Sequence, residues 1–208
     1  HEDYPTTKGY QALFYAALLQ TGLPKVDKVV TGLPVSQYLD KDKRNALSWM
    51  AGIHQVTPKI EIEVGEVSTV GQPLGAYVSS AMQQGREKEF SRSRVLVLDV
   101  GFFSTDWVLI DHHELVGQFS GTSTQATSVV LEEACGLIQQ DFGGRLSRER
   151  LERAIREDGF MYLFGKEIEL DGYLRQAAQN IAEPLVSEIR ASLRKVAKKA
   201  EIIVLAGG

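Results

Sequence analysis

The part of the sequence with the clearest chemical potential is a polar turn that follows a short apolar run. Residues 95–98 read Val-Leu-Val-Leu. Five residues suited to anion or cation binding follow, namely Asp99, Gly101, Ser104, Thr105 and Asp106. Glycine lets the backbone approach an anion, and turn amides and hydroxyls can donate to phosphate oxygens. A carboxylate beside a phosphate needs a cation between them, so Asp99 is a candidate for holding hydrated Mg²⁺. The spacing is typical of a phosphate-binding hairpin, although plain turns also contain such residues.

Two strands must position this turn. The apolar run predicts one strand over 94–99, and the apolar residues after Asp106 predict a second over 106–110. A turn at 111–114 and a third strand over 115–119 would complete a meander.

The rest of the chain predicts alternating helices and strands. Helices are expected over 11–20, 41–50, 75–84, 122–140, 147–156 and 171–199, and further strands over 29–30, 59–64, 67–70 and 201–205. Ser147 is a suitable N-cap for its helix. Pro184 predicts a kink or a break in the last helix. Residues 85–94 are polar and favour a connector.

Composition and charge exclude some classes of protein. The chain has 208 residues and a formal net charge of −4, so direct binding to nucleic acid is not expected. A basic run near the end is more simply a solvated helix face, and it comprises Arg190, Arg194, Lys195, Lys198 and Lys199. Cys135 is the only cysteine, which excludes an internal disulfide and fits a cytoplasmic protein. No apolar run is long enough to span a membrane.

Four segments, in order, resemble the actin superfamily, which includes actin, sugar kinases, chaperone ATPases and the ParM/StbA plasmid-segregation proteins. The run Asp-x-Gly-x-x-Ser-x-Asp at 99–106 is similar to the second phosphate motif of that superfamily. Residues 31–38, Thr-Gly-Leu-Pro-Val-Ser-Gln-Tyr, and residues 165–171 look like stretches of the ParM/StbA group. Residues 202–208, Ile-Ile-Val-Leu-Ala-Gly-Gly, look like the start of an adenosine motif.

This resemblance implies an α/β, actin-like ATPase fold, with two RNase H-like lobes of mixed sheets and flanking helices around a nucleotide cleft. Residues 1–90 would be the C-terminal part of lobe I, without its first phosphate hairpin. Residues 91–208 would be lobe II, with an inserted helical subdomain at about 143–170. Both ends of the chain are interpreted as truncated.

The resemblance also implies roles for single residues, with ATP and Mg²⁺ as the ligands. Asp99 would hold Mg²⁺ through water, and Asp99 and Gln72 would be the catalytic pair, Gln72 orienting the attacking water. The nucleotide-binding residues would be Asp99, Gly101, Ser104, Thr105, Asp106, Gly121, Ser123, Gly207 and Gly208. Phe102 and Phe103 depart from the chaperones, where these positions are small. Gln72 also suits a plain polar position before Pro73.

The implied function is an ATP-hydrolysing protein that polymerises into filaments for plasmid partition. Its partners would be further copies of itself and a DNA-binding adaptor protein. Two alternatives remain: a non-catalytic nucleotide-dependent switch or scaffold, and a small-molecule kinase. Without the first phosphate hairpin, the 208-residue chain is expected to hydrolyse ATP poorly or not at all.

Several conspicuous residues favour structural roles. His112 and His113 suggest an exposed turn rather than a metal site. Trp49, Trp107 and Cys135 lie among apolar residues and suggest core positions.

Overall fold

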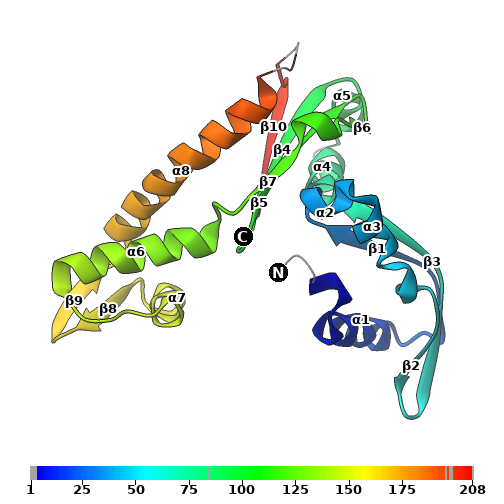
Figure 1. The fold of residues 1–208 in the computed structure, drawn as a ribbon, viewed down its shortest axis with the longest axis horizontal. Coiled ribbons are helices and arrows are strands. Elements are labelled where there is room, and N and C mark those ends of the chain that lie inside the picture. The colour runs from blue at the N-terminus through cyan, green and yellow to red at the C-terminus, as the bar shows by residue number, and fades with distance from the viewer. Residues whose placement is uncertain (1–3, 84, 195, 197–198, 208) are drawn as a thin grey trace. The chain divides into compact units, whose positions relative to one another are not determined.

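The computed structural model describes residues 4–83, 85–194, 196 and 199–207 (Figure 1). They form two compact units, one ending at Val78 and the other beginning at Ser79. This division lies inside helix α4 (Gln72–Gln83), earlier than the expected boundary at residue 90. Each unit is described by itself below.

The first unit is a three-stranded sheet with helices. Its elements are η1 (Tyr4–Thr6), α1 (Lys8–Thr21), β1 (Lys25–Leu33), α2 (Val35–Leu39), α3 (Lys41–Asn45), η2 (Ser48–Met50), β2 (Gly52–Thr57) and β3 (Ile60–Gly71). The strand order is β1-β3-β2, with β1 parallel and β2 antiparallel to β3. Because β1 and β3 are parallel, their carboxyl ends, at Leu33 and Gly71, lie at the same edge of the sheet.

The core of the first unit joins α1 to one face of this sheet. Its buried residues are Phe14, Leu18, Leu33, Leu47, Met50, Ile62 and Val64. Trp49 packs against the core, as expected from the sequence. Gly22 ends α1 with a left-handed backbone, φ 66°, a conformation that glycine adopts without strain.

Three expectations for this unit need correction. The segments 59–64 and 67–70 belong to the single strand β3. The helix expected over 41–50 is divided into α3 and η2, and Leu47 and Met50, at the two ends of the 3₁₀ turn, are both buried. Strand β2 was not expected, and it is fixed by pairing with β3, where His54 lies opposite Ile62.

The second unit contains a five-stranded sheet. After α4 and α5 (Glu87–Phe90) come β4 (Arg94–Val100), β5 (Thr105–Asp111), β6 (Glu114–Leu115), η3 (Gly117–Phe119), β7 (Gly121–Ser123) and, at the end, β10 (Ile202–Gly207). The order is β10-β4-β5-β6, and β7 also pairs with β5. Among the described strands of this sheet, β10 and β4 form the only parallel pair.

The third strand of the meander differs from its prediction. The strand expected over 115–119 ends at Leu115, and η3 follows. The 3₁₀ turn returns the chain to β5, where Gly121 lies opposite Trp107. Helix α6 (Thr127–Phe142) therefore begins after this pairing and not at residue 122.

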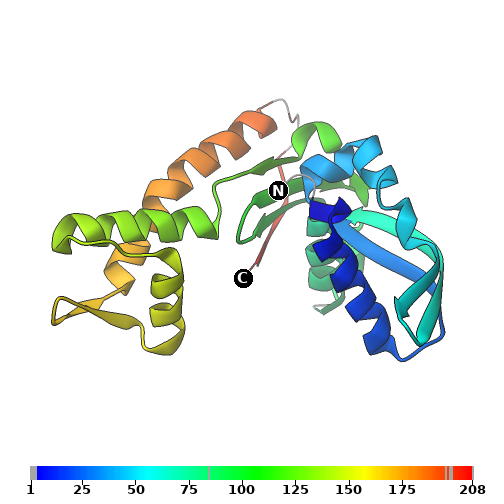
Figure 2. The same cartoon turned by 60° about the horizontal axis from the view of Figure 1, so that its bottom comes forward.

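A helical layer completes the second unit. It consists of α6, α7 (Arg148–Glu157), the antiparallel hairpin β8 (Phe160–Leu163) and β9 (Lys166–Glu169), and α8 (Asp171–Leu193). Helices α6 and α8 pack together (Figure 2). Eleven buried residues form the core of this layer: Leu131, Ala134, Cys135, Ile138, Leu146, Leu151, Met161, Leu163, Ile168, Leu170 and Ala177.

Predictions for this layer are partly confirmed. Ser147 caps α7 by accepting a hydrogen bond from the amide of Arg150, at 3.3 Å. The segment 143–170 holds a strand hairpin as well as a helix. Helix α8 continues through Pro184 instead of breaking, because Pro184 is exposed and water can satisfy the carbonyl that loses its bond. The predicted basic positions Lys195 and Lys198 lie outside the described residues. No helix among those described has the length and apolarity to cross a membrane.

Candidate phosphate-binding hairpin

The β4–β5 hairpin brings Asp99 and Asp106 together. Asp99 pairs with Asp106 across the two strands, and Val100 pairs with Thr105. The turn is closed by the Gly101 amide, which donates to the Ser104 carbonyl at 2.9 Å. Side chains of directly opposed residues project from the same face of a sheet, so the two carboxylates are neighbours.

Asp106 is a buried carboxylate whose oxygens both accept hydrogen bonds. It is 3% exposed. The Ser104 hydroxyl donates to Oδ2 at 3.0 Å, and the Thr122 hydroxyl donates to Oδ1 at 2.5 Å. These bonds offset the cost of burying the charge and tie the turn to β7. This geometry favours a structural role for Asp106.

Asp99 differs from Asp106 in its surroundings. Burial raises the pKa of its carboxyl above the usual 3.8, and the charge of Asp106 raises it further. Within the described part of the chain, no lysine or arginine pairs with Asp99. A divalent cation held there would relieve the repulsion between the two carboxylates. The residues fit Mg²⁺, which takes one or two carboxylates and completes its shell with water and phosphate.

The hydroxyls of Ser104 and Thr105 already have acceptors. Thr105 is fully buried and donates to the Gln125 carbonyl at 2.6 Å, while Ser104 donates to Asp106. A hydroxyl has one hydrogen, so neither group can also donate to a phosphate in this arrangement. Their predicted phosphate contacts therefore require a change of rotamer or remain indirect.

The backbone of the turn offers donors instead. In the described part of the chain, the amides of Phe102, Phe103 and Ser104 donate no hydrogen bond. Three successive amides without an acceptor are the kind of donor set that binds anions. Sequence reasoning anticipated turn amides at this place, but which amides are unpaired depends on the fold.

The predicted nucleotide-binding glycines each have a packing role. A Cβ on Gly101 would lie 2.9 Å from the Ser104 carbonyl oxygen, and one on Gly121 would lie 2.5 Å from Cζ2 of Trp107. A Cβ on Gly207 would lie 2.7 Å from the carbonyl carbon of Val100 and closer still to its oxygen. Close packing of the sheet thus accounts for these glycines without a ligand. Gly208 lies outside the described residues.

The pairing of β10 with β4 brings a further predicted residue to the hairpin. Ala206 lies opposite Asp99 and Gly207 opposite Val100, so Gly207 reaches the same sheet edge as the turn. Ser123, on β7, is buried and accepts a hydrogen bond from the Gln125 amide at 3.1 Å. Asp99, Gly101, Ser104, Thr105, Asp106, Gly121, Ser123 and Gly207 therefore all belong to one group of neighbouring strands and their turn.

Gln72 belongs to the other unit. It is exposed and is the first residue of α4, directly after the carboxyl end of β3. Its Cγ lies 2.9 Å from where a Cβ of Gly32 would be, so Gly32 leaves room for this side chain. Gln72 and the Thr-Gly-Leu-Pro segment thus meet at the carboxyl edge of the first sheet. Ligands of α/β sheets commonly bind at such edges.

Sequence reasoning missed three contributors to the hairpin. Thr122 donates to Asp106, and the first amides of α6 donate to the turn carbonyls. Arg148 lies over the ring of Phe102, 5.4 Å from its centroid. None carries a sequence signal of its own, because each acts through a contact between distant segments.

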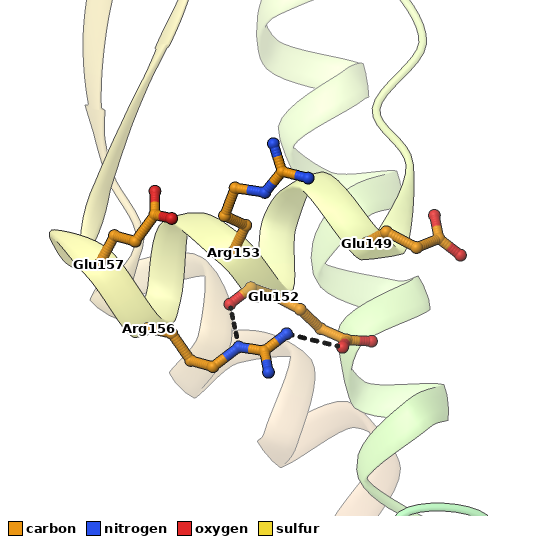
Figure 3. Close-up of a pocket in the computed structure, with 5 residues that line it drawn as sticks. All are labelled: Glu149, Glu152, Arg153, Arg156 and Glu157. Atoms are coloured by element: carbon orange, nitrogen blue, oxygen red, sulfur yellow. Dashed lines mark hydrogen bonds and ion pairs between the residues drawn. The ribbon is translucent and has the colours of Figure 1, made fainter.

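Two other groups of polar residues in the described part of the chain lack the features of a binding site. A hollow on α7 is lined by Glu149, Glu152, Arg153, Arg156 and Glu157, all from one helix, and Arg156 pairs with Glu152 (Figure 3). Such a charged face is typical of a solvated helix. His112 and His113 are exposed in a turn, as expected, and the described residues contain no cluster of three metal-binding side chains.

Comparison with known protein families agrees with this architecture. A family model described as "Actin like proteins N terminal domain" matches residues 1–75. Another, described as "Archaeal actin homologue MreB-like, C-terminal", matches residues 97–208, more than half of the chain. The chain belongs to the actin-like proteins. No curated protein matches it significantly.

Solved structures share the fold of this actin-like protein. The archaeal actin homolog Ta0583, in complex with ADP, has a TM-score of 0.77 and 17% identity, covering 98% of this chain and 66% of its own. A 15-stranded ParM filament from Clostridium botulinum has a TM-score of 0.69 and 20% identity, covering 100% of this chain and 65% of its own. Apo psk41 ParM has a TM-score of 0.60 and 16% identity, covering 100% of this chain and 61% of its own. These likenesses confirm the predicted α/β actin-like fold, and the chain spans less than two thirds of the length of each.

Proposed function

We propose that this actin-like protein binds ATP with Mg²⁺ at the β4–β5 hairpin. The observation that carries the proposal is the turn itself, where three amides with no acceptor among the described residues stand beside the half-buried Asp99. The ADP complex of the archaeal actin homolog and a Bacillus thuringiensis ParM structure with ATP support a nucleotide as the ligand.

Each group at the hairpin has a distinct part in this binding. The amides of Phe102, Phe103 and Ser104 would donate to phosphate oxygens, and Asp99 would hold Mg²⁺ through its water shell. The bound metal supplies neutralisation of phosphate charge. Gly207, next to Val100, would face the adenosine and α-phosphate part of the nucleotide. Gln72 would orient the attacking water during hydrolysis.

We further propose that nucleotide binding is coupled to self-assembly into filaments for plasmid partition, as in ParM and StbA proteins. The Clostridium botulinum relative solved as a ParM filament supports assembly of like copies. A net charge of −4 favours contact with DNA through an adaptor protein over direct binding. Such a protein would need no membrane.

The test is ATP-dependent sedimentation of the protein with Mg²⁺, together with binding of a fluorescent ATP analogue. The Asp99→Ala variant removes the metal-holding carboxylate, and Asp141→Ala, an exposed carboxylate at the end of α6, is the matched control. We expect the wild type and the control to bind and sediment, and Asp99→Ala to need roughly tenfold more Mg²⁺, a typical loss when a metal-binding group is removed. Equal Mg²⁺ dependence in all three would refute the role of Asp99, and absence of sedimentation would refute filament formation.

One observation favours a second function, a nucleotide-dependent switch without turnover. The hydroxyls of Ser104 and Thr105 donate their hydrogen bonds to acceptors within the protein. Fewer donors are therefore available to stabilise the negative charge that develops on the phosphate during hydrolysis. A switch would bind the analogue with Mg²⁺ and release no phosphate over many hours.

A further inference from the structure

The turn between β4 and β5 is attached to the helical layer through its carbonyl groups. The amide of Thr127 donates to the Gly101 carbonyl at 3.2 Å, and the amide of Ser128 donates to the Phe102 carbonyl at 2.9 Å. The first amides of a helix have no partner within the helix. The turn thus supplies acceptors to the start of α6, and the two segments are joined.

The side chain of Phe102 makes a second attachment. Phe102 packs against the core of the helical layer, which contains Leu131, Leu151 and Met161 from three of its elements. Phe103, the next residue, is 72% exposed and meets Phe102 edge-on at 4.8 Å between centroids. The two phenylalanines thus differ in their surroundings: the ring of Phe102 packs against the core of the helical layer, and the ring of Phe103 is exposed to solvent.

Arg148 closes this attachment from the side of α7. Its guanidinium lies 5.4 Å from the centroid of the Phe102 ring, a cation–π distance. Arg148 is the first residue of α7, where the positive end of the helix dipole disfavours a cation. The contact with Phe102 therefore accounts for an arginine at this position, whereas the stability of α7 does not.

Two glutamates hold Arg148 in this position. Glu132 on α6 lies 3.3 Å from Nη1, and Glu152 on α7 lies 3.4 Å from Nε. With its charge balanced by two carboxylates, Arg148 is suited to stacking on Phe102 and poorly suited to binding a phosphate itself.

We infer that Arg148 is a positioning residue for the phosphate turn, acting through Phe102. Arg148 links the side chain of Phe102, and through it the turn at residues 101–104, to α7, so the shape of the turn depends on where α7 lies. Its consequence for ligand binding depends on the proposed nucleotide site: a bound nucleotide and the position of α7 would each bias the other.

The direct test is amide hydrogen exchange of the 208-residue chain without nucleotide. Arg148→Met keeps the apolar stem and removes the cation, and Arg148→Lys restores a cation. The matched control is Arg153→Met, an exposed arginine on the same helix. The reporting amides are those hydrogen-bonded at the turn, namely Gly101, Thr127 and Ser128. We expect their exchange to become about two- to fivefold faster in Arg148→Met, the range for losing a partly exposed cation–π contact, and to recover in part in Arg148→Lys.

The pattern of exchange separates positioning from a general structural role. Faster exchange confined to the amides of Gly101, Thr127 and Ser128 supports the inference, with the amides of α7 unchanged. Equal acceleration throughout the helical layer, or none at the turn, would overturn it. Phe102→Leu keeps an apolar side chain in the core and is expected to reproduce the effect on the turn. It therefore tests the same contact independently if the arginine variant fails to fold.

A second readout distinguishes this inference from the proposed function. With Mg²⁺ and ADP, we expect Arg148→Met to weaken nucleotide affinity by about two- to fivefold, and Arg153→Met to leave it unchanged. Absence of ADP binding in the wild type would refute the proposed nucleotide site while leaving the exchange result to decide the role of Arg148. Wild-type affinity in Arg148→Met would overturn the coupling to the ligand.

Discussion

At the scale of single residues, the hairpin contrasts two neighbouring carboxylates. Asp106 is buried and satisfied by two hydroxyl donors, whereas Asp99 is half-buried with a raised pKa. The same residue type thus serves two purposes, because the fold places hydrogen-bond donors around one carboxylate and leaves the other open. A group held at a cost to stability is a common mark of a functional site.

The raised pKa of Asp99 gives a pH-dependent prediction. A carboxyl whose pKa is raised in the folded state stabilises the fold below its unfolded value, near 3.8, and that stability is lost as pH rises through the folded value. Asp99→Asn should therefore raise the free energy of unfolding at pH 7 in metal-free buffer, and the gain should vanish below pH 3.8. Urea unfolding at a series of pH values measures this.

Asp111 provides a control of opposite sign. Hydrogen bonds from Arg94 and then His112 lower the pKa of its carboxyl. Asp111→Asn should lower stability at pH 7, and the loss should shrink as pH falls toward the lowered value. The same sign of effect in both variants would contradict the assignment for Asp99.

Thr122 permits a second prediction at this scale. Thr122→Val keeps the shape of the side chain and removes the hydroxyl that donates to Asp106. Because a buried charge loses a donor, we expect stability to fall by about 1–3 kcal/mol. The exposed Thr124→Val should change it by less than about 0.5 kcal/mol. Fluorescence of Trp107, in a Trp49→Phe background, reports on this unit; matching midpoints for the two variants would exclude a stabilising role.

At the scale of elements, β10 depends on one glycine. Gly207 has φ 120° and approaches the backbone of Val100 where β10 ends. The strand carries Ile203 and Leu205 on its exposed face and buries Val204 against the sheet. Pairing with β4, rather than side-chain burial, therefore holds its last residues in place.

Substitution of Gly207 should disrupt this pairing in the absence of any ligand. Gly207→Ala adds a Cβ that overlaps the backbone of Val100, so we expect a loss of about 2 kcal/mol or more in the free energy of unfolding. Gly172→Ala, in α8 with open space around its Cα, should be stabilising by about 0.5–1 kcal/mol. Denaturant midpoints of both variants give the comparison. A neutral Gly207→Ala would contradict this packing role.

At the scale of the whole molecule, each of the two units has its own core and its own candidate residues. The first contributes Gln72 at the carboxyl edge of its sheet, and the second contributes the hairpin with Asp99. Phosphoryl transfer needs donors and cations disposed around the transferred group. One hairpin supplies only part of such a set.

We therefore expect the 208-residue chain to show no catalysed hydrolysis of ATP. Its rate of phosphate release should be no higher than that of its Asp99→Ala variant. A continuous phosphate-release assay with Mg²⁺ measures both. Turnover within the usual range for such enzymes, roughly 1 s⁻¹ or faster, would contradict this expectation. Binding of nucleotide without turnover would be consistent with it.

The sequence by itself determined the class of fold and the place of the hairpin. An apolar run, a glycine and two aspartates in order define a strand, a turn and a second strand through local preferences alone. The alternation of 59–64, the cap at Ser147 and the burial of Trp107 and Cys135 rest on equally local rules, and the structure confirms them.

Only the tertiary structure decided which groups are available for chemistry. The partners of Ser104, Thr105 and Asp106 come from segments about 2 to 20 residues away, and that of Phe102 comes from α7. Hydrogen-bond donors and acceptors are assigned by proximity in space, which sequence spacing does not encode. For the same reason only the structure shows that a Cβ at Gly101, Gly121 or Gly207 would meet neighbouring atoms, and that three turn amides have no acceptor among the described residues.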